Sequence, residues 1–213
     1  MEFAITASMA DDSYSFSVYL KKELLCNERE NILKIRSFFK KLGIVVVCLG
    51  VFSGCSNFHE VTPGNLYRSA QLSGRGFDHY IKKYGIKTVI NLRGGSPGAK
   101  WYDDEMNTMK KDSVLHIDIP LSATHYVPSQ KIDSIMGVAS IVPRPILVHC
   151  RGGADRSGLF CASWRLKIEN YPAEKSSKQL SFIYGHIPFS RWSNTKAMDS
   201  SFNDYVRYLK NRE

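Results

Sequence analysis

The segment ILVHCRGGADRSG, residues 146–158, constrains the fold of this 213-residue chain more than any other. Its apolar beginning, up to His149, predicts a short buried strand, and a helix is expected to start near Ser157. The intervening Gly152 and Gly153 allow the backbone to curl tightly without Cβ clashes. A loop of this kind points successive backbone N–H groups inward and lies at a helix N-terminus. The N–H groups and the helix N-terminus both favour a bound anion. The segment therefore predicts an anion-binding loop between a strand and a helix.

A thiol and a guanidinium stand at the two ends of this loop. The loop dipoles and the helix N-terminus stabilise a thiolate at Cys150, and Arg156 can hold two phosphate oxygens and match the charge of a phosphoryl-transfer transition state. Cys150 would attack phosphorus to form a phosphocysteine, which water then hydrolyses. We expect Ser157 to donate a hydrogen bond to the sulfur and His149 to order the loop, and this chemistry requires no metal or other cofactor. The expected phosphate-binding residues are Arg151, Gly152, Gly153, Ala154, Asp155 and Arg156.

The run His-Cys-x5-Arg-Ser at residues 149–157 resembles the signature of the protein tyrosine and dual-specificity phosphatases. Three further segments resemble bacterial members of the dual-specificity type: YRSAQ at 67–71, GIKTVINLR at 85–93 and IPL at 119–121. The resemblance implies hydrolysis of phosphomonoesters, with a phosphorylated protein or a small phosphoester as substrate. A phosphoinositide substrate is an alternative within the same fold.

Such phosphatases usually supply an aspartate from a separate loop to protonate the leaving oxygen, and here its identity stays open. Asp118 is the only carboxylate in the expected loop, residues 117–128, but it stands in a predicted strand and can equally be structural. Asp155 is the rival, because some bacterial phosphatases resemble its Gly-x-Asp-Arg arrangement. It can equally be a solvated carboxylate that orients the neighbouring arginine. His125 is a third candidate, and Arg93 is expected to brace the wall of the site.

Strands and helices alternate along the rest of the chain, which predicts an α/β fold with a central, mostly parallel sheet flanked by helices. The catalytic domain is expected at 63–213, after a polar linker at 56–62. Trp164, Trp192 and Cys161 are expected in its core. The expected strands are 66–68, 87–92, 114–119 and 146–149, and the expected helices are 73–84, 101–111, 129–141, 157–168, 173–184 and 195–210.

Residues 34–55 have the layout of a secretory signal peptide, in which basic residues, an apolar run and small residues follow one another. The apolar run, 42–52, is shorter than the roughly 20 residues that a membrane-spanning helix needs. A buried core helix is the alternative. The end resembles the lipobox of bacterial lipoproteins, with Phe52 where Leu is usual, and this implies a lipidated Cys55. We expect an exported lipoprotein anchored on the periplasmic side or at the outer membrane, with a cytoplasmic protein as the alternative. Residues 1–33 fit no signal peptide and are expected to be unstructured or to precede the true start.

The net charge of +9 favours an anionic partner such as a phosphorylated substrate or an acidic membrane. Nucleic acid is not expected, because no run of Lys and Arg is interleaved with aromatic residues. The five cysteines match no zinc or disulfide framework. Two other functions remain open. A rhodanese-like sulfur transferase also uses a cysteine in a curled loop, although the Arg-Ser-Gly ending at 156–158 opposes it, and an inactive phosphate-binding module would keep the same loop.

Overall fold

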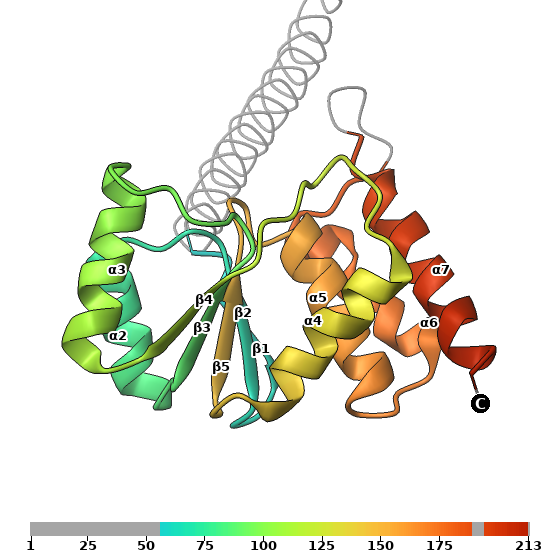
Figure 1. Ribbon diagram of the computed structural model, residues 1–213, viewed down its shortest axis with the longest axis horizontal. Coiled ribbons are helices and arrows are strands. Elements are labelled where there is room, and N and C mark those ends of the chain that lie inside the picture. The colour runs from blue at the N-terminus through green and yellow to red at the C-terminus, as the bar shows by residue number, and fades with distance from the viewer. Residues whose placement is uncertain (1–55, 189–193, 213) are drawn as a thin grey trace, which may run out of the picture. The chain divides into compact units, whose positions relative to one another are not determined.

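A computed structural model describes residues 56–188 and 194–212, which form a five-stranded sheet flanked by helices (Figure 1). The strands lie in the order β1-β2-β5-β3-β4; β1 is antiparallel to β2, and the remaining neighbours are parallel. This confirms the predicted α/β fold with a mostly parallel sheet. The strands are β1 His59–Thr62, β2 Leu66–Ser69, β3 Thr88–Asn91, β4 Leu115–Asp118 and β5 Ile146–His149.

Helices cover both faces of the sheet, α2 and α3 on one side and α4, α5 and α7 on the other (Figure 1). Each side has its own apolar cluster, and β3 and β5, in the middle of the sheet, are buried throughout. Five of the six predicted helices are confirmed, with ends that differ by a residue or two. The helices are α2 Gly74–Tyr84, α3 Lys100–Asp112, α4 Ser129–Ile141, α5 Asp155–Lys167, α6 Ala173–Ser176 and α7 Lys196–Lys210, with 3₁₀ turns η1 Ser177–Gln179 and η2 Phe182–Tyr184.

The sixth predicted helix, at 173–184, is wrong, because α6, η1 and η2 occupy this stretch as separate short pieces. Tertiary contacts explain the break. The carbonyl of Gln179 accepts a hydrogen bond from Arg68 instead of from a later turn of its own helix. The same stretch packs so tightly on α5 that a Cβ at Gly158 would lie 2.8 Å from the Leu180 side chain. Only glycine permits this approach.

The expected linker at 56–62 is also wrong, because its second half, His59–Thr62, is the strand β1. The carbonyl of Ser56 accepts a hydrogen bond from the amide of Ala70 at 2.7 Å. Phe58 stacks on Tyr80 with ring centroids 3.8 Å apart. The short polar sequence suggested a linker, whereas pairing with β2 makes residues 59–62 the edge strand of the sheet.

Trp164 and Cys161 are buried on α5, as predicted. Trp192 and the N-terminal segments 1–33 and 34–55 lie outside the described residues, so their predictions stay predictions. Within 56–188 and 194–212, no helix is long and apolar enough to cross a bilayer.

Candidate active site

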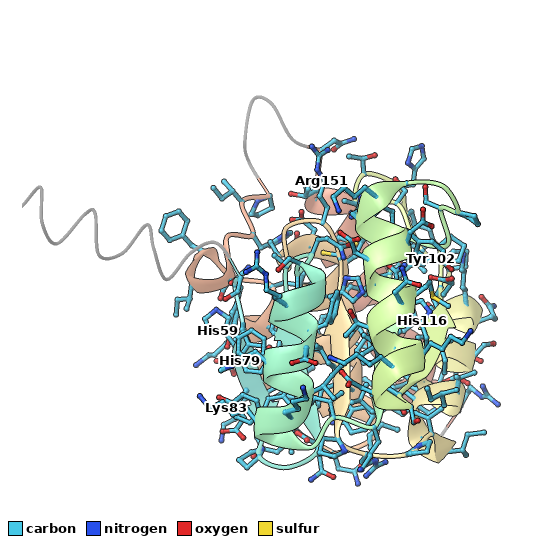
Figure 2. All side chains as sticks on the ribbon, turned by 90° about the vertical axis from the view of Figure 1, so that its left-hand side faces the viewer. His59, His79, Lys83, Tyr102, His116 and Arg151 are labelled. Atoms are coloured by element: carbon cyan, nitrogen blue, oxygen red, sulfur yellow. The ribbon has the colours of Figure 1, made fainter. Side chains whose placement is uncertain are left out.

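The predicted anion-binding loop runs from Cys150 to Ala154, between β5 and α5. Parallel strands bring their carboxyl ends to one edge of a sheet, where ligands bind in open α/β folds. Figure 2 shows the loop residue Arg151 at this end of the molecule and Lys83, in the last turn of α2, at the opposite end. The loop therefore occupies the edge of the sheet at which a site is expected.

Cys150 is 2% exposed, and its sulfur lies inside the curl of this loop. The backbone N–H of Gly153 donates to Sγ at 3.2 Å. Gly153 has φ +71°, and a Cβ there would lie 2.6 Å from the backbone nitrogen of Ala70, so the position requires glycine. The loop is thus pressed against the end of β2 with an amide aimed at the sulfur.

The guanidinium of Arg156 is anchored along one edge and leaves other donors available. Its Nη1 donates to the carbonyls of Leu92 and Leu121, both at 3.2 Å. Its Nε is buried and has no acceptor among the described residues. Ser157 Oγ is likewise buried and unpartnered within the described part of the chain, so its bond to sulfur stays a prediction. Buried donors of this kind need an acceptor, and an anion in the loop would supply it.

A buried carboxylate fixes the orientation of His149. Oε1 of Glu105, on α3, lies 2.9 Å from Nε2 of His149 and 2.8 Å from Nε2 of His116. Because an ionised carboxylate only accepts, each imidazole donates from Nε2. Gln71 donates to the second carboxylate oxygen at 2.8 Å. Burial alone would raise the pKa of Glu105, but the hydrogen bonds from His116 and His149 outweigh it and hold that pKa at about 2.

Arg93 braces one wall of the site. Its guanidinium lies over the ring of Trp101 at 3.4 Å and donates to Gln71 Oε1 at 2.7 Å. The backbone N–H of Gln71 donates in turn to the carbonyl of Arg151, in the loop. Burial, followed by the neighbouring charge of Arg156, lowers the pKa of Arg93. These contacts fit the bracing role that the sequence suggested.

A second buried guanidinium, that of Arg68 on β2, lies behind the loop. Its Nη2 donates to the carbonyls of Gly153 at 2.8 Å and Ala154 at 3.0 Å, and its Nη1 donates to both oxygens of Gln179 at 2.9 Å. Arg68 is fully buried, and the oxygens that these four hydrogen bonds reach are carbonyl and amide oxygens, not carboxylates. By holding two loop carbonyls away from the sulfur, it leaves the N–H groups of the loop pointing inward.

Asp118 is not brought against the sulfur. It stands at the end of β4, which β3 separates from β5. Its Oδ1 accepts from the Asn91 amide at 2.7 Å, and its Oδ2 accepts from the Tyr102 hydroxyl at 2.5 Å. Because both oxygens are already engaged in binding neighbouring elements, the geometry favours the structural alternative for Asp118.

We therefore expect Asp118→Asn to weaken the fold and not the protonation step. Asparagine can still accept from Asn91 and donate to the Tyr102 hydroxyl, but both hydrogen bonds lose their charged acceptor, which costs about 1–3 kcal/mol of unfolding free energy. Urea unfolding measures this loss, and kcat on an aryl and an alkyl phosphate measures the chemistry. Both substrates should slow equally. A selective loss of about 10²-fold or more on the alkyl phosphate, whose leaving group needs the proton, would instead make Asp118 the general acid.

Asp155 lies in the first turn of α5 and is paired with a histidine that the sequence analysis did not single out. Nδ1 of His186 lies 2.7 Å from Asp155 Oδ1, and its Nε2 lies 2.9 Å from Asp199 Oδ2. Burial would lower the pKa of His186, but the two carboxylates raise it to about 9. A charged imidazolium thus joins the start of α5 to α7, and it engages an oxygen of the Asp155 carboxylate. The bonded partner of Asp155 is thus His186, and the bonds of Arg156 go to Leu92 and Leu121, so both alternatives for Asp155 stay predictions.

The ion pairs of His186 predict a pH-dependent stability. The pKa of this histidine is about 9 in the fold against an ordinary 6.5, so its stabilisation is complete below pH 6.5 and is lost as pH rises through 9. His186→Gln should therefore cost up to about 3 kcal/mol at pH 6. The difference from wild type should shrink towards pH 9.5, as measured by denaturant unfolding across this range. A difference that stays constant from pH 6 to pH 10 would show that His186 is not held as an imidazolium.

His125 is the third candidate acid and lies on the loop between β4 and α4. It is exposed, and its Nδ1 lies 2.7 Å from Ser122 Oγ. The same loop reaches the site through the carbonyl of Leu121, which accepts from Arg156. The role of His125 as general acid therefore stays a prediction.

Comparisons with known proteins agree with this arrangement. The dual-specificity protein phosphatase TpbA of Pseudomonas aeruginosa is 23% identical over 126 residues, which cover 58% of this chain and 53% of TpbA. The chain thus spans about half the length of the curated relatives it matches. The crystal structure of TpbA superposes with a TM-score of 0.54 at 19% identity, over 71% of this chain and 91% of that one. The core catalytic domain of the PP-IP phosphatase SIW14 from S. cerevisiae superposes with a TM-score of 0.53 at 19% identity, over 73% and 91%.

These two structures share the fold of this chain. A family model described as "DSP-PTPase phosphatase fused to NAD+ Kinase" matches residues 54–199. That range includes the loop from Cys150 to Ala154, together with Arg156, Arg68 and Glu105. The chain belongs to this DSP-PTPase phosphatase family.

Proposed function

We propose that this chain is a cysteine-dependent phosphatase that hydrolyses phosphomonoesters through a phosphocysteine at Cys150. One observation carries the proposal: the sulfur lies inside the loop with the Gly153 amide donating to it, while the buried Nε of Arg156 has no acceptor within 56–188 and 194–212. A thiolate and a guanidinium in this arrangement are the nucleophile and the oxyanion clamp that phosphoryl transfer needs.

The proposed reaction has two steps, and each uses groups of the loop and of α5. The sulfur of Cys150 attacks phosphorus as the ester P–O bond breaks and the alcohol leaves with a proton, while the loop N–H groups and Arg156 bind the equatorial oxygens. Water then cleaves the S–P bond and releases phosphate, and the hydroxyl of Ser157 is available to donate to the departing sulfur. Glu105 is a positioning residue, because it holds the imidazole of His149, the residue that precedes the loop. Arg156, at the start of α5, also donates to the carbonyl of Leu121, so the segment after β4 is bonded to the phosphate clamp.

Phosphotyrosine or another phosphomonoester on a protein is the substrate that we favour. A Cys-to-Ser variant of TpbA was crystallised in complex with phosphotyrosine. Exposed Arg151 and half-buried Arg93 give the site a cationic rim suited to an anionic ester. Phosphoinositides and small phosphoesters fit the same rim, and a substrate panel of phosphopeptides, phosphoinositides and sugar phosphates distinguishes these classes.

Trapping the intermediate tests the reaction itself. The full chain, mixed with p-nitrophenyl phosphate and quenched in acid, should carry one phosphate on the peptide that contains Cys150, as detected by mass spectrometry. Vanadate should suppress both the label and the release of nitrophenol. Steady release of nitrophenol without any label on Cys150 would exclude the covalent route. Thiocyanate production from thiosulfate and cyanide, without phosphatase turnover, would favour the sulfur transferase.

We also propose that the chain is an exported lipoprotein held at a membrane by a lipid on Cys55. The basic, apolar and small-residue order of residues 34–55 supports this, and so does the net charge of +9. Mass spectrometry of the protein extracted from membranes should find a lipidated Cys55 as the first residue. A Cys55→Ala variant should lose the lipid, and a native N-terminus within residues 1–33 would contradict the proposal.

A further inference from the structure

Two consecutive apolar side chains on η2 are exposed to solvent. Phe182 is 78% exposed and Ile183 is 80% exposed. Among the large apolar residues that the structure describes, only Ile141, at 83%, is as exposed. Single exposed apolar residues are ordinary, whereas an adjacent pair at the tip of a turn is a small apolar patch that needs an explanation.

This pair lies beside the active-site loop and not at a remote end of the fold. The side-chain amide of Asn57 donates both to the carbonyl of Gly152, in the loop, and to the carbonyl of Tyr184, in η2, at 2.8 and 2.9 Å. The ring of Tyr184 lies over the guanidinium of Arg68, with 4.1 Å between CZ and the ring centroid. The turn that presents Phe182 is therefore bonded to the rim of the site.

The chain also enters the domain at this point. Asn57 joins the loop to η2, and the carbonyl of the preceding Ser56 is bonded to Ala70 at the end of β2. Cys55 is one peptide unit before Ser56, and consecutive Cα atoms are about 3.8 Å apart. A lipid on Cys55 would thus hold this end of the domain within about 10 Å of the headgroups, since no flexible linker intervenes.

Exposed cations surround the same end of the sheet. Arg151 belongs to the loop itself (Figure 2), Arg75 lies in the first turn of α2, and Lys178 lies in η1, just before η2. Each cation near an anionic bilayer surface is worth about 1 kcal/mol of attraction. An apolar tip flanked by such cations has the composition of a surface that inserts shallowly among acidic lipids.

We propose that Phe182 and Ile183 insert into the anionic bilayer to which the chain is tethered, so that the active-site loop faces the headgroups. This docking surface, formed by η2 with Arg75, Arg151 and Lys178, rests on the proposed attachment through Cys55. The phosphatase then works on phosphoesters presented at the membrane surface, and substrates far from the bilayer reach the site less readily.

A tryptophan at the tip reports the insertion. The full chain isolated from membranes is placed in vesicles of phosphatidylcholine and phosphatidylglycerol, some with brominated acyl chains that quench indole emission. Phe182→Trp should add emission that is blue-shifted and quenched by the brominated lipid. The matched control is Ile141→Trp, equally exposed at the end of α4 that precedes β5, and its added emission should be neither shifted nor quenched. Turnover of soluble p-nitrophenyl phosphate, expected to match wild type in both variants, shows that the fold and the catalytic site are intact.

Flotation of the same samples separates the possible failures. If the chain floats with the vesicles but the added emission of Phe182→Trp behaves like that of Ile141→Trp, the tether stands and the docking surface is wrong. If the chain does not float, the attachment fails and the docking surface fails with it, while turnover of the soluble substrate still reports on the phosphatase. A blue shift without quenching by brominated lipid would assign the patch to a protein contact, such as a second copy, and would also overturn the proposal.

Discussion

Replacing Cys150 with serine is expected to abolish turnover, with a loss in kcat on the order of 10⁴-fold or more. The serine hydroxyl does not ionise near neutral pH, so the loop amide and the helix N-terminus have no anion to stabilise as a nucleophile. Binding should survive, because the loop N–H groups and Arg156 are unchanged. Stopped-flow or steady-state release of nitrophenol measures the first effect, and calorimetric titration with inorganic phosphate measures the second.

Cys161 provides the matched control for this variant. It lies on α5, after the loop, and is fully buried, and burial raises its pKa to about 11. It therefore stays a neutral thiol at the pH of the assay and serves only as a small apolar core residue. Cys161→Ala should keep most of the wild-type turnover at a modest cost in stability. Comparable losses in the two variants, or substantial turnover by Cys150→Ser, would show that the sulfur of Cys150 is not the nucleophile.

The parts of the fold that follow from local pattern were predictable from the sequence. The apolar run at 146–149 and the glycines after it specify a strand and a tight loop wherever they occur. The helix at 73–84 has Ser73 at its start and Gly85 at its end; the Ser73 hydroxyl accepts from Gly76, and Gly85 takes φ +64°. Each of these signals lies within a few residues of the element it defines, so no knowledge of the rest of the chain is needed.

What could not be predicted depends on contacts between distant segments. The helix expected at 173–184 breaks because Arg68, more than a hundred positions earlier, takes the carbonyl of Gln179. The role of Asp118 is undecidable in the sequence, since its partner Tyr102 comes from a different element. Glu105 carried a weak signal, because it is spaced four residues from Trp101 and from Met109 in the helix predicted at 101–111, and a carboxylate on such an apolar face must find partners.

Arg68 was missed for the same reason, although it lies in the YRSAQ segment that resembles related phosphatases. We expect Arg68→Met to lower kcat by about 10²-fold, a loss comparable to that of one oxyanion donor. Without the guanidinium, the carbonyls of Gly153 and Ala154 lose their donor and are free to turn towards the sulfur. The same change also removes a permanent positive charge from behind the loop. Alkylation by iodoacetamide at pH 7, which uses the same sulfur of Cys150 as its nucleophile, should therefore slow as well. Arg68→Lys should recover part of both rates, since an ammonium keeps the charge but cannot bind all four oxygens.

Loss of a buried side chain also destabilises the fold. The positioning role of Arg68 therefore needs a control in which another arginine bonded to the backbone is removed. Arg165, on α5, likewise donates to a backbone carbonyl, that of Val61, and lies over a tyrosine ring, that of Tyr171 at 4.9 Å. It bonds no residue of the active-site loop, so Arg165→Met should lower the unfolding free energy while leaving kcat and the alkylation rate near wild type. If both variants lose activity only in proportion to stability, or if Cys150 in Arg68→Met is alkylated at the wild-type rate, then Arg68 supports the fold alone. A selective loss in Arg68→Met, with partial recovery in Arg68→Lys, would establish that the loop depends on a guanidinium behind it as well as on the one that binds phosphate.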